Sequence, residues 1–214
     1  MSISIKPTVA VLGGAGKAGR PLIEEALRQG YTVRALLRHP SQFELSHNRL
    51  TIITGDARDP LAIRHVVKGS AALVSTLGNP RGENTPILSQ VTEQLLPALK
   101  AEGISRYITL TSLYATEGEQ ADEKTRLSAA FMQQHFPAFM ADRVREYQLL
   151  QNSDLDWTYV RIPYLVQSPV VGTVQTQLGY MPGSQLAVAD LATFLLKQLD
   201  SEAFIRKSPF VANT

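Results

Sequence analysis

Apolar positions along the first half of the chain follow two patterns, short runs rich in apolar and β-branched residues and longer stretches with helical spacing. The short runs that stop at turn residues predict strands, and the longer stretches predict amphipathic helices. The predicted strands span residues 8–12, 32–37, 50–54, 71–75 and 107–110, and the predicted helices span residues 17–29, 60–68 and 85–102. Because strands and helices alternate at the spacing of βαβ units, the expected fold is α/β, a Rossmann-type doubly wound parallel sheet.

The pattern weakens after Ser112. Residues 117–126 are polar and charged, which predicts a loop or an exposed helix start, and the Gly- and Pro-rich residues 167–185 predict turns that cover a site. The remaining predicted elements are helices at residues 138–152 and 190–200 and strands at residues 157–161 and near residue 210. We expect one domain over residues 1–214, with a small C-terminal extension from about residue 114 on the substrate side.

The composition of the chain narrows the range of functions. Cysteine is absent, which excludes disulfides, thiolate metal sites and cysteine nucleophiles. The net charge is +2 and the 21 basic residues are scattered, which argues against nucleic acid as the main partner. The four histidines lack ligand spacing and the acidic residues near 120 are typical of a solvated face, so no metal is expected. No apolar run is long enough to cross a bilayer, and we expect a cytoplasmic protein without a membrane function.

Four glycines follow the first predicted strand, in the sequence GGAGKAG. The first glycine permits a tight turn, the middle one lets backbone N–H groups approach a pyrophosphate, and the last allows close helix packing. The next helix begins with orphan N–H groups that favour an anion, and the spacing excludes a Walker P-loop. This loop therefore predicts dinucleotide binding, and the residues expected to contact the cofactor are Gly13, Gly14, Ala15, Gly16, Lys17, Ala18 and Gly19.

The end of the second predicted strand indicates which dinucleotide is bound. Arg38 lies at this end, in ALLRHP, and no carboxylate follows before Glu44. An acidic residue here accepts hydrogen bonds from the ribose 2′-hydroxyl of NAD(H), whereas an arginine complements the 2′-phosphate of NADP(H). The sequence therefore favours NADP(H) as the cofactor, with the alternative that Arg38 is a solvated loop cation.

The ends of four further strands carry residues compatible with the same ligand. Asp56 and Ala57 follow the third strand, where a carboxylate can accept a hydrogen bond from an adenine amino group. The contacts expected from the later strand ends are Thr76, Leu77, Gly78, Thr111, Ser112 and Pro163. Because ligands of open α/β sheets bind outside the carboxyl ends of the strands, all these residues predict one crevice.

These motifs together resemble the atypical short-chain dehydrogenase/reductase superfamily, and within it the NmrA-like NAD(P)H-binding group, which includes flavin reductase and biliverdin reductase B-like proteins. The resemblance covers roughly residues 8–200 and is carried by GGAGKAG, ALLR, GDARD, STLG, TLTS and LQNSDLDWTYVRIPYL. It implies that the pyrophosphate is contacted by Gly13, Gly16, Lys17 and Ala18 and the 2′-phosphate by Arg38. The adenine would contact Asp56 and Ala57, and the adenine-side ribose would contact residues 76–78. Ser112 and Pro163 would lie near the nicotinamide.

The chain departs from this superfamily at its catalytic dyad. Typical members use a tyrosine and a lysine four residues later to exchange a proton with a substrate carbonyl, and none of the seven tyrosines here has that partner. The resemblance puts Phe139 at the tyrosine position and Arg143 at the lysine position. Phenylalanine cannot donate a proton, which disfavours reduction of a simple ketone because the alkoxide that forms needs a positioned acid.

A planar conjugated acceptor avoids this difficulty, because it spreads the charge and solvent can supply the proton. The leading hypothesis is therefore an NADPH-dependent oxidoreductase that transfers a hydride to a small molecule such as a flavin or a quinone. Ser112 and Tyr114 are the candidate catalytic residues, with the alternatives that Ser112 only caps a strand end and Tyr114 only packs. The missing dyad equally supports a non-catalytic, NADP(H)-binding redox sensor of the NmrA type. In either case we expect a monomer or a homodimer.

Overall fold

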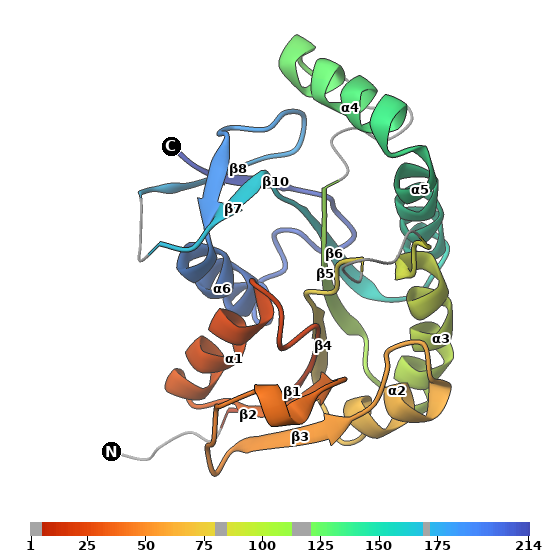
Figure 1. Ribbon diagram of the computed structural model, residues 1–214, viewed down its shortest axis with the longest axis vertical. Helices are drawn as coiled ribbons and strands as arrows, with labels where there is room; N and C mark the ends of the chain where they lie inside the picture. The colour runs from red at the N-terminus through yellow and green to blue at the C-terminus, as the bar shows by residue number, and fades with distance from the viewer. Residues whose placement is uncertain (1–5, 80–84, 113–120, 169–171) are drawn as a thin grey trace.

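The ten strands described in the computed structural model form one sheet (Figure 1). The structure describes residues 6–79, 85–112, 121–168 and 172–214. The strands are β1 (Thr8–Leu12), β2 (Thr32–Leu37), β3 (Leu50–Thr54), β4 (Ala72–Ser75), β5 (Arg106–Thr111), β6 (Asp156–Arg161), β7 (Tyr164–Val166), β8 (Val174–Gln177), β9 (Gln185–Ala187) and β10 (Phe210–Asn213). The helices are α1 (Gly19–Arg28), α2 (Pro60–Val67), α3 (Leu88–Ala101), α4 (Glu123–His135), α5 (Pro137–Gln151) and α6 (Val188–Lys197), with a 3₁₀ turn at Pro40–Gln42.

The first six strands form the parallel part of the sheet, in the order β3-β2-β1-β4-β5-β6. This is the order of a Rossmann fold, in which the chain starts in the middle of the sheet and winds outward in both directions. β10 continues the sheet beside β6 and pairs antiparallel with β8 and β9, and β7 lies parallel to β9. The doubly wound α/β fold that the sequence predicts is therefore confirmed.

Helices cover both faces of the parallel sheet. α1 and α6 pack together on one face, and α2, α3 and α5 cover the other, as Figure 1 shows. In β1, Val9 and Val11 belong to one apolar core and Ala10 and Leu12 to the other. Side chains alternate between the two faces of a strand, so both faces of β1 are enclosed. The unbroken apolar runs in the sequence correspond to strands of this kind.

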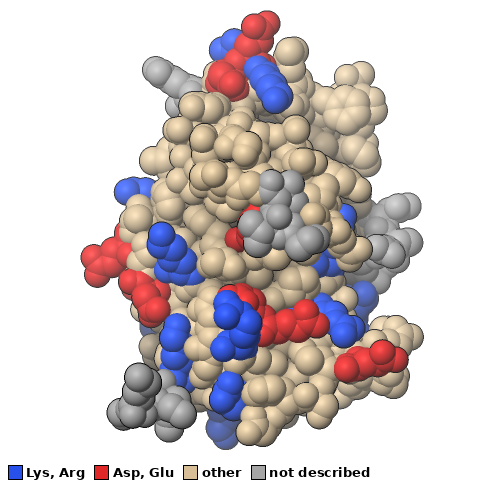
Figure 2. Space-filling model, turned by 90° about the vertical axis from the view of Figure 1, so that its left-hand side faces the viewer, with Lys and Arg blue, Asp and Glu red and all other residues tan. Residues whose placement is uncertain are grey.

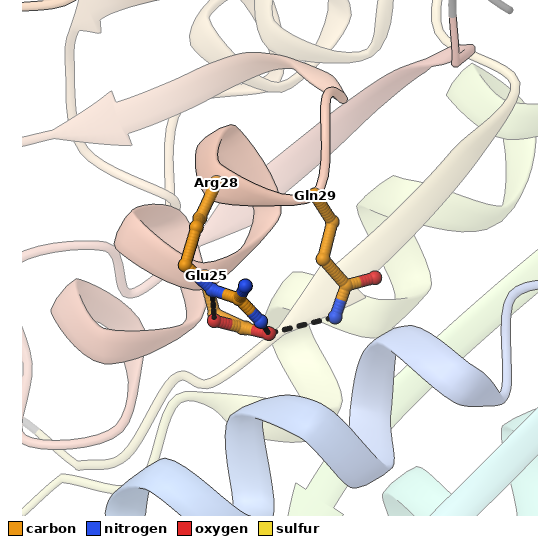
Figure 3. A network of polar contacts seen from close by, with 3 residues as sticks. All are labelled: Glu25, Arg28 and Gln29. Carbon is orange, nitrogen blue, oxygen red and sulfur yellow. Dashed lines mark hydrogen bonds and ion pairs between the residues drawn. The ribbon is translucent and has the colours of Figure 1, made fainter.

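Helix α1 shows how the local sequence produces this packing. Leu22 and Ile23 are fully buried against the sheet, and burying such a side chain contributes about 1.5–3 kcal/mol. Near the end of the helix, Glu25 accepts hydrogen bonds from Arg28 and Gln29 at 2.5–2.8 Å (Figure 3). Because Arg28 is exposed to solvent, this ion pair stabilises the helix less than burial of its apolar face does.

Two parts of the second half of the chain were predicted incompletely from the sequence. α4 begins within residues 117–126, where an exposed helix start was one of two alternatives, but its full length was not predicted because it buries little and exposes the apolar Leu127 and Phe131. It begins after Asp122, whose carboxylate accepts a hydrogen bond from the Thr125 backbone N–H at 2.9 Å. β7, β8 and β9 span only three or four residues each, which is too short to show a period of two. One of them, β8, lies inside the stretch predicted to be turns.

Buried polar side chains join the segments after β6 to β6 and α6. Arg161, the last residue of β6, donates hydrogen bonds to the carbonyl oxygens of Ser208 and Leu178, both at 2.9 Å. Asn213 of β10 donates to the carboxylate of Asp190 in α6 at 2.8 Å. A buried polar group costs free energy unless it is hydrogen-bonded, so these bonds fix how the segments after β6 lie against β6 and α6.

Charged side chains of both signs are mixed on the described surface. Figure 2 shows Lys, Arg, Asp and Glu interspersed on the lower half of one face, whereas much of its upper half is uncharged. No helix within the described ranges is both long and apolar enough to span a bilayer.

Candidate functional site

The carboxyl ends of the parallel strands open onto a cavity of about 840 Å³. Leu12 of β1 pairs with Leu36 of β2 and with Ser75 of β4, so the segments that follow these strands meet at one edge of the sheet. Such an edge is where open α/β sheets bind their ligands. The predicted site residues that line the cavity are Gly13, Gly14, Ala15, Gly16, Lys17, Ala18, Arg38, Asp56, Ala57, Thr76, Leu77, Gly78, Thr111, Ser112 and Pro163.

Gly19 is the predicted contact that the structure places away from the cavity wall. Helix α1 begins at this buried residue rather than at Lys17, because the preceding loop turns through a hydrogen bond from Gly16 N–H to Gly13 C=O at 2.9 Å. A Cβ at position 19 would lie 2.1 Å from the Gly13 carbonyl oxygen. The absence of a side chain therefore lets the helix pack directly on the loop. Tyr114, the second candidate catalytic residue, lies outside the described residues.

The glycine loop brings main chain, rather than side chains, to the cavity. Gly13 has a φ of +74°, and a Cβ there would lie 2.7 Å from the carbonyl carbon of Thr76. The Thr76 hydroxyl donates to the Leu12 carbonyl at 3.0 Å, which joins the turn after β1 to the segment after β4. Gly16 is exposed on the wall, so no side chain separates its backbone from a ligand. This geometry fits an oxyanion such as a pyrophosphate.

Lys17 connects the glycine loop to the far side of the cavity. Its ammonium group donates a hydrogen bond to the backbone carbonyl of Leu165 in β7. The same ammonium lies 4.8 Å from the ring centroid of Tyr164, an exposed residue that also lines the cavity. Lys17 therefore adds positive charge to the wall while it ties the loop to β7.

One end of the cavity carries the charges predicted for the adenosine half of a dinucleotide. Arg38 follows β2 and Asp56 follows β3, and both line the wall. Arg58 donates to the Asp56 carboxylate through its backbone N–H at 2.8 Å and its guanidinium at 2.7 Å. These bonds, with the nearby charge of Arg38, hold the pKa of Asp56 below its usual value. His39 and Gln42 also line this end, although neither is among the site residues predicted from the sequence.

The opposite end of the cavity is built from the segments after β5 and β6. Thr111 and Ser112 line it together with Pro163, and Arg143 of α5 completes the wall. Arg143 was placed at the lysine position of the superfamily, but only the packing of α5 shows that it lines the cavity. Asn79, next to the predicted Gly78, also lines the cavity, and its side-chain oxygen is buried without a hydrogen-bond partner among the described residues. A buried acceptor of this kind is suited to a ligand N–H or O–H group.

A buried carboxyl lies behind this end of the wall. Glu146 of α5 is 1% exposed and accepts hydrogen bonds from the hydroxyls of Tyr159 at 2.8 Å and Thr92 at 3.1 Å. Burial raises the pKa of Glu146 to about 7, against the opposing effect of these two bonds and of the Arg143 charge. The Tyr159 hydroxyl also hydrogen-bonds the side chain of Thr111, so the buried carboxyl is linked to a residue of the cavity wall.

The described walls fit a dinucleotide on two independent grounds. The loop of residues 13–18 offers a side-chain-free backbone beside a lysine, and the strand ends that follow add a cation, Arg38, at the other predicted phosphate position. The match to a known family agrees with this. A family model described as NAD(P)H-binding matches residues 13–202.

The chain belongs to the NAD(P)H-binding family. This membership confirms the prediction that the protein binds a nicotinamide dinucleotide. A short-chain dehydrogenase/reductase of Veillonella parvula, solved in complex with NADP, superposes with a TM-score of 0.78 at 16% identity and covers 97% of this chain and 94% of its own. The anaerobillin reductase ChuY of Escherichia coli O157:H7 gives a TM-score of 0.79 at 20% identity, with 97% of both chains covered. At these identities the likeness concerns the fold.

A curated relative of this NAD(P)H-binding protein is the photosystem II assembly factor Ycf39 of Cyanophora paradoxa. The two are 24% identical over 216 residues, which cover 92% of this chain and 62% of the relative. The chain therefore spans less than two thirds of the length of that relative.

Proposed function

We propose that the protein is an NADPH-dependent oxidoreductase that transfers a hydride to a planar conjugated acceptor, such as a flavin or a quinone. The observation that carries this proposal is that Ser112 lines the same cavity as the residues suited to a dinucleotide. When bound there, reduced nicotinamide supplies the hydride.

The type of acceptor is argued from the missing proton donor. Phe139, at the tyrosine position of the superfamily, is not among the described residues that line the cavity, and its ring packs near that of Phe136 with the centroids 6.5 Å apart. A ketone would therefore lack a positioned acid at this point. A conjugated acceptor delocalises the incoming charge, and the Ser112 hydroxyl is suited to hydrogen-bond the acceptor or to orient a water molecule.

The preference for NADPH is supported by the charge at the end of β2. Arg38 is a cation where NAD-specific proteins of this fold carry a carboxylate. We expect Arg38→Glu to abolish the preference for NADPH over NADH, measured as the ratio of the two dissociation constants by titration. Lys68→Glu is the matched control, since it makes the same charge change at an exposed residue after α2. Equal affinities of the unmodified protein for NADPH and NADH would refute the assignment.

Turnover is tested by following NADPH oxidation with flavin and quinone acceptors under anaerobic conditions. We expect saturable turnover, with kcat/KM lowered at least about tenfold in Ser112→Ala because a hydrogen bond to the reacting partner is lost. Ser46→Ala, at an exposed loop residue, is the control. Tight binding of NADPH without turnover across a broad panel of acceptors would contradict the proposal and favour the redox-sensing alternative.

A further inference from the structure

Arg143 occupies the wall of the cavity next to the residues that follow β5. It is half-buried in α5 and lines the cavity with Thr111 and Ser112. The Tyr159 hydroxyl lies 3.3 Å from the Arg143 carbonyl oxygen and also hydrogen-bonds Thr111. The backbone of Arg143 therefore lies close to the strand end that carries Ser112, and its side chain lines the proposed acceptor end.

The guanidinium of Arg143 makes few hydrogen bonds with the described residues. Among the described residues, its single hydrogen bond is from Nη1 to the carbonyl of Phe139 at 3.4 Å, and its Nε is buried without a partner. The buried Arg106 differs, because it donates to the Gln198 carbonyl at 2.7 and 2.9 Å and to the Thr158 hydroxyl at 2.8 Å. Leaving a partly buried cation with unused donors costs free energy, which an incoming anion would recover.

The two carboxyl groups on the same helix are engaged elsewhere. Asp142 accepts hydrogen bonds from the backbone N–H groups of Leu88 and Ser89 at the start of α3, at 3.0 and 3.2 Å. Glu146 accepts from Tyr159 and Thr92 as described above; the Arg143 charge lowers its pKa, but among the described contacts no hydrogen bond joins the two side chains. The charge of Arg143 is therefore available to a ligand in the cavity.

The anionic groups of the cofactor are accounted for by other residues. The glycine loop is suited to the pyrophosphate and Arg38 to the 2′-phosphate, and both lie on the segments after β1 and β2 rather than after β5. We propose that Arg143 is a specificity residue that binds an oxyanion of the acceptor, a carboxylate or a phosphate attached to its planar ring system. A guanidinium suits this task because its planar fork can donate two parallel hydrogen bonds to one oxyanion. The inference rests on the proposed reductase function.

The test compares acceptors that differ only in an oxyanion. Riboflavin and flavin mononucleotide form the phosphate pair, and a naphthoquinone with and without a carboxylate substituent forms the carboxylate pair. We expect the protein to prefer the charged member of at least one pair by about tenfold or more in kcat/KM, and Arg143→Gln to reduce this ratio to about one. Arg143→Lys should restore part of the preference, since a lysine keeps the charge without the fork.

Arg145→Gln is the matched control, because Arg145 lies on the same helix, is 61% exposed and pairs with Glu93 at 3.1 Å. It should leave the ratio unchanged. An equal kcat/KM for both members of both pairs would overturn the inference, as would a tenfold loss of NADPH affinity in Arg143→Gln, which would assign Arg143 to the cofactor.

If the proposed reductase function is wrong, the inference about Arg143 is tested by binding rather than by turnover. If none of the four acceptors is reduced, equilibrium binding of the same pairs to the NADP⁺-loaded protein decides the inference. Tighter binding of a charged member that Arg143→Gln abolishes would support it, and equal binding within each pair would refute it.

Discussion

Replacing the buried Glu146 by glutamine removes a titration that opposes folding at neutral pH. The carboxyl has a usual pKa of 4.5, and burial raises it to about 7 in the folded protein. Between these two values the folded state keeps a proton that the unfolded state has released. Raising the pH through this range therefore favours unfolding, so the stability associated with protonated Glu146 is present below pH 4.5 and is lost as the pH rises through about 7.

The size of the effect follows from the width of this range. Each pH unit changes the free energy of unfolding by about 1.4 kcal/mol while one proton separates the two states, which gives about 3 kcal/mol over the whole range. Glutamine has no such titration and still offers an oxygen to the hydroxyl of Tyr159 or Thr92. We therefore expect Glu146→Gln to gain stability relative to the unmodified protein as the pH rises from 5 to 8, by about 2.5 kcal/mol in total.

The assay is urea unfolding at pH 5, 6, 7 and 8, followed by the fluorescence of Trp157. This residue is the only tryptophan of the chain and is 2% exposed, so its emission reports the opening of the core around it. Glu202→Gln at an exposed position is the control, and its stability difference should stay constant with pH. The reasoning is refuted if the difference between Glu146→Gln and the unmodified protein is also constant over this range.

Two further substitutions test the packing that shapes the site. Gly19→Ala should lower the free energy of unfolding by about 1–3 kcal/mol, since the new Cβ would meet the Gly13 carbonyl oxygen, whereas Gly78→Ala, with nothing within 4 Å of its Cβ, should have a much smaller effect in the same urea titration. Asp142→Ala should cost about 0.5–2 kcal/mol by removing the acceptor for the first N–H groups of α3, and a loss no larger than that of the exposed Asp154→Ala would contradict this role.

The sequence predicts the central strands well because they are buried on both faces, which leaves unbroken apolar runs such as residues 9–12 and 72–74. Most of the cavity wall follows from the same strands, since their carboxyl ends must meet at one edge. Only the start of α4 was predicted, as one of two alternatives, because the helix exposes Leu127 and Phe131 and buries few residues. The spacing of apolar residues in the sequence does not show how far such an exposed helix extends.

The residues contributed by the helices and the C-terminal extension were harder to predict than those on strand ends. Arg143 lies on α5, whose face toward the cavity is set by contacts with α3 that are distant in sequence. The glycine spacing puts Gly19 among the expected cofactor contacts and also assigns it to close helix packing. In the structure Gly19 is buried and a Cβ there would lie 2.1 Å from the Gly13 carbonyl oxygen, which agrees with the packing role.

The bond between Lys17 and Leu165 joins residues that are 148 positions apart in the chain. A contact between residues so far apart in the sequence forms only after the intervening chain has folded back, and it does not stabilise either segment alone. A fragment that ends before β6 would keep the glycine loop but lose the wall that faces it. We therefore expect binding of the dinucleotide to be coupled thermodynamically to folding of the segments after β6. A substitution that destabilises β7 or β10 should then weaken cofactor binding at the glycine loop near the other end of the sequence.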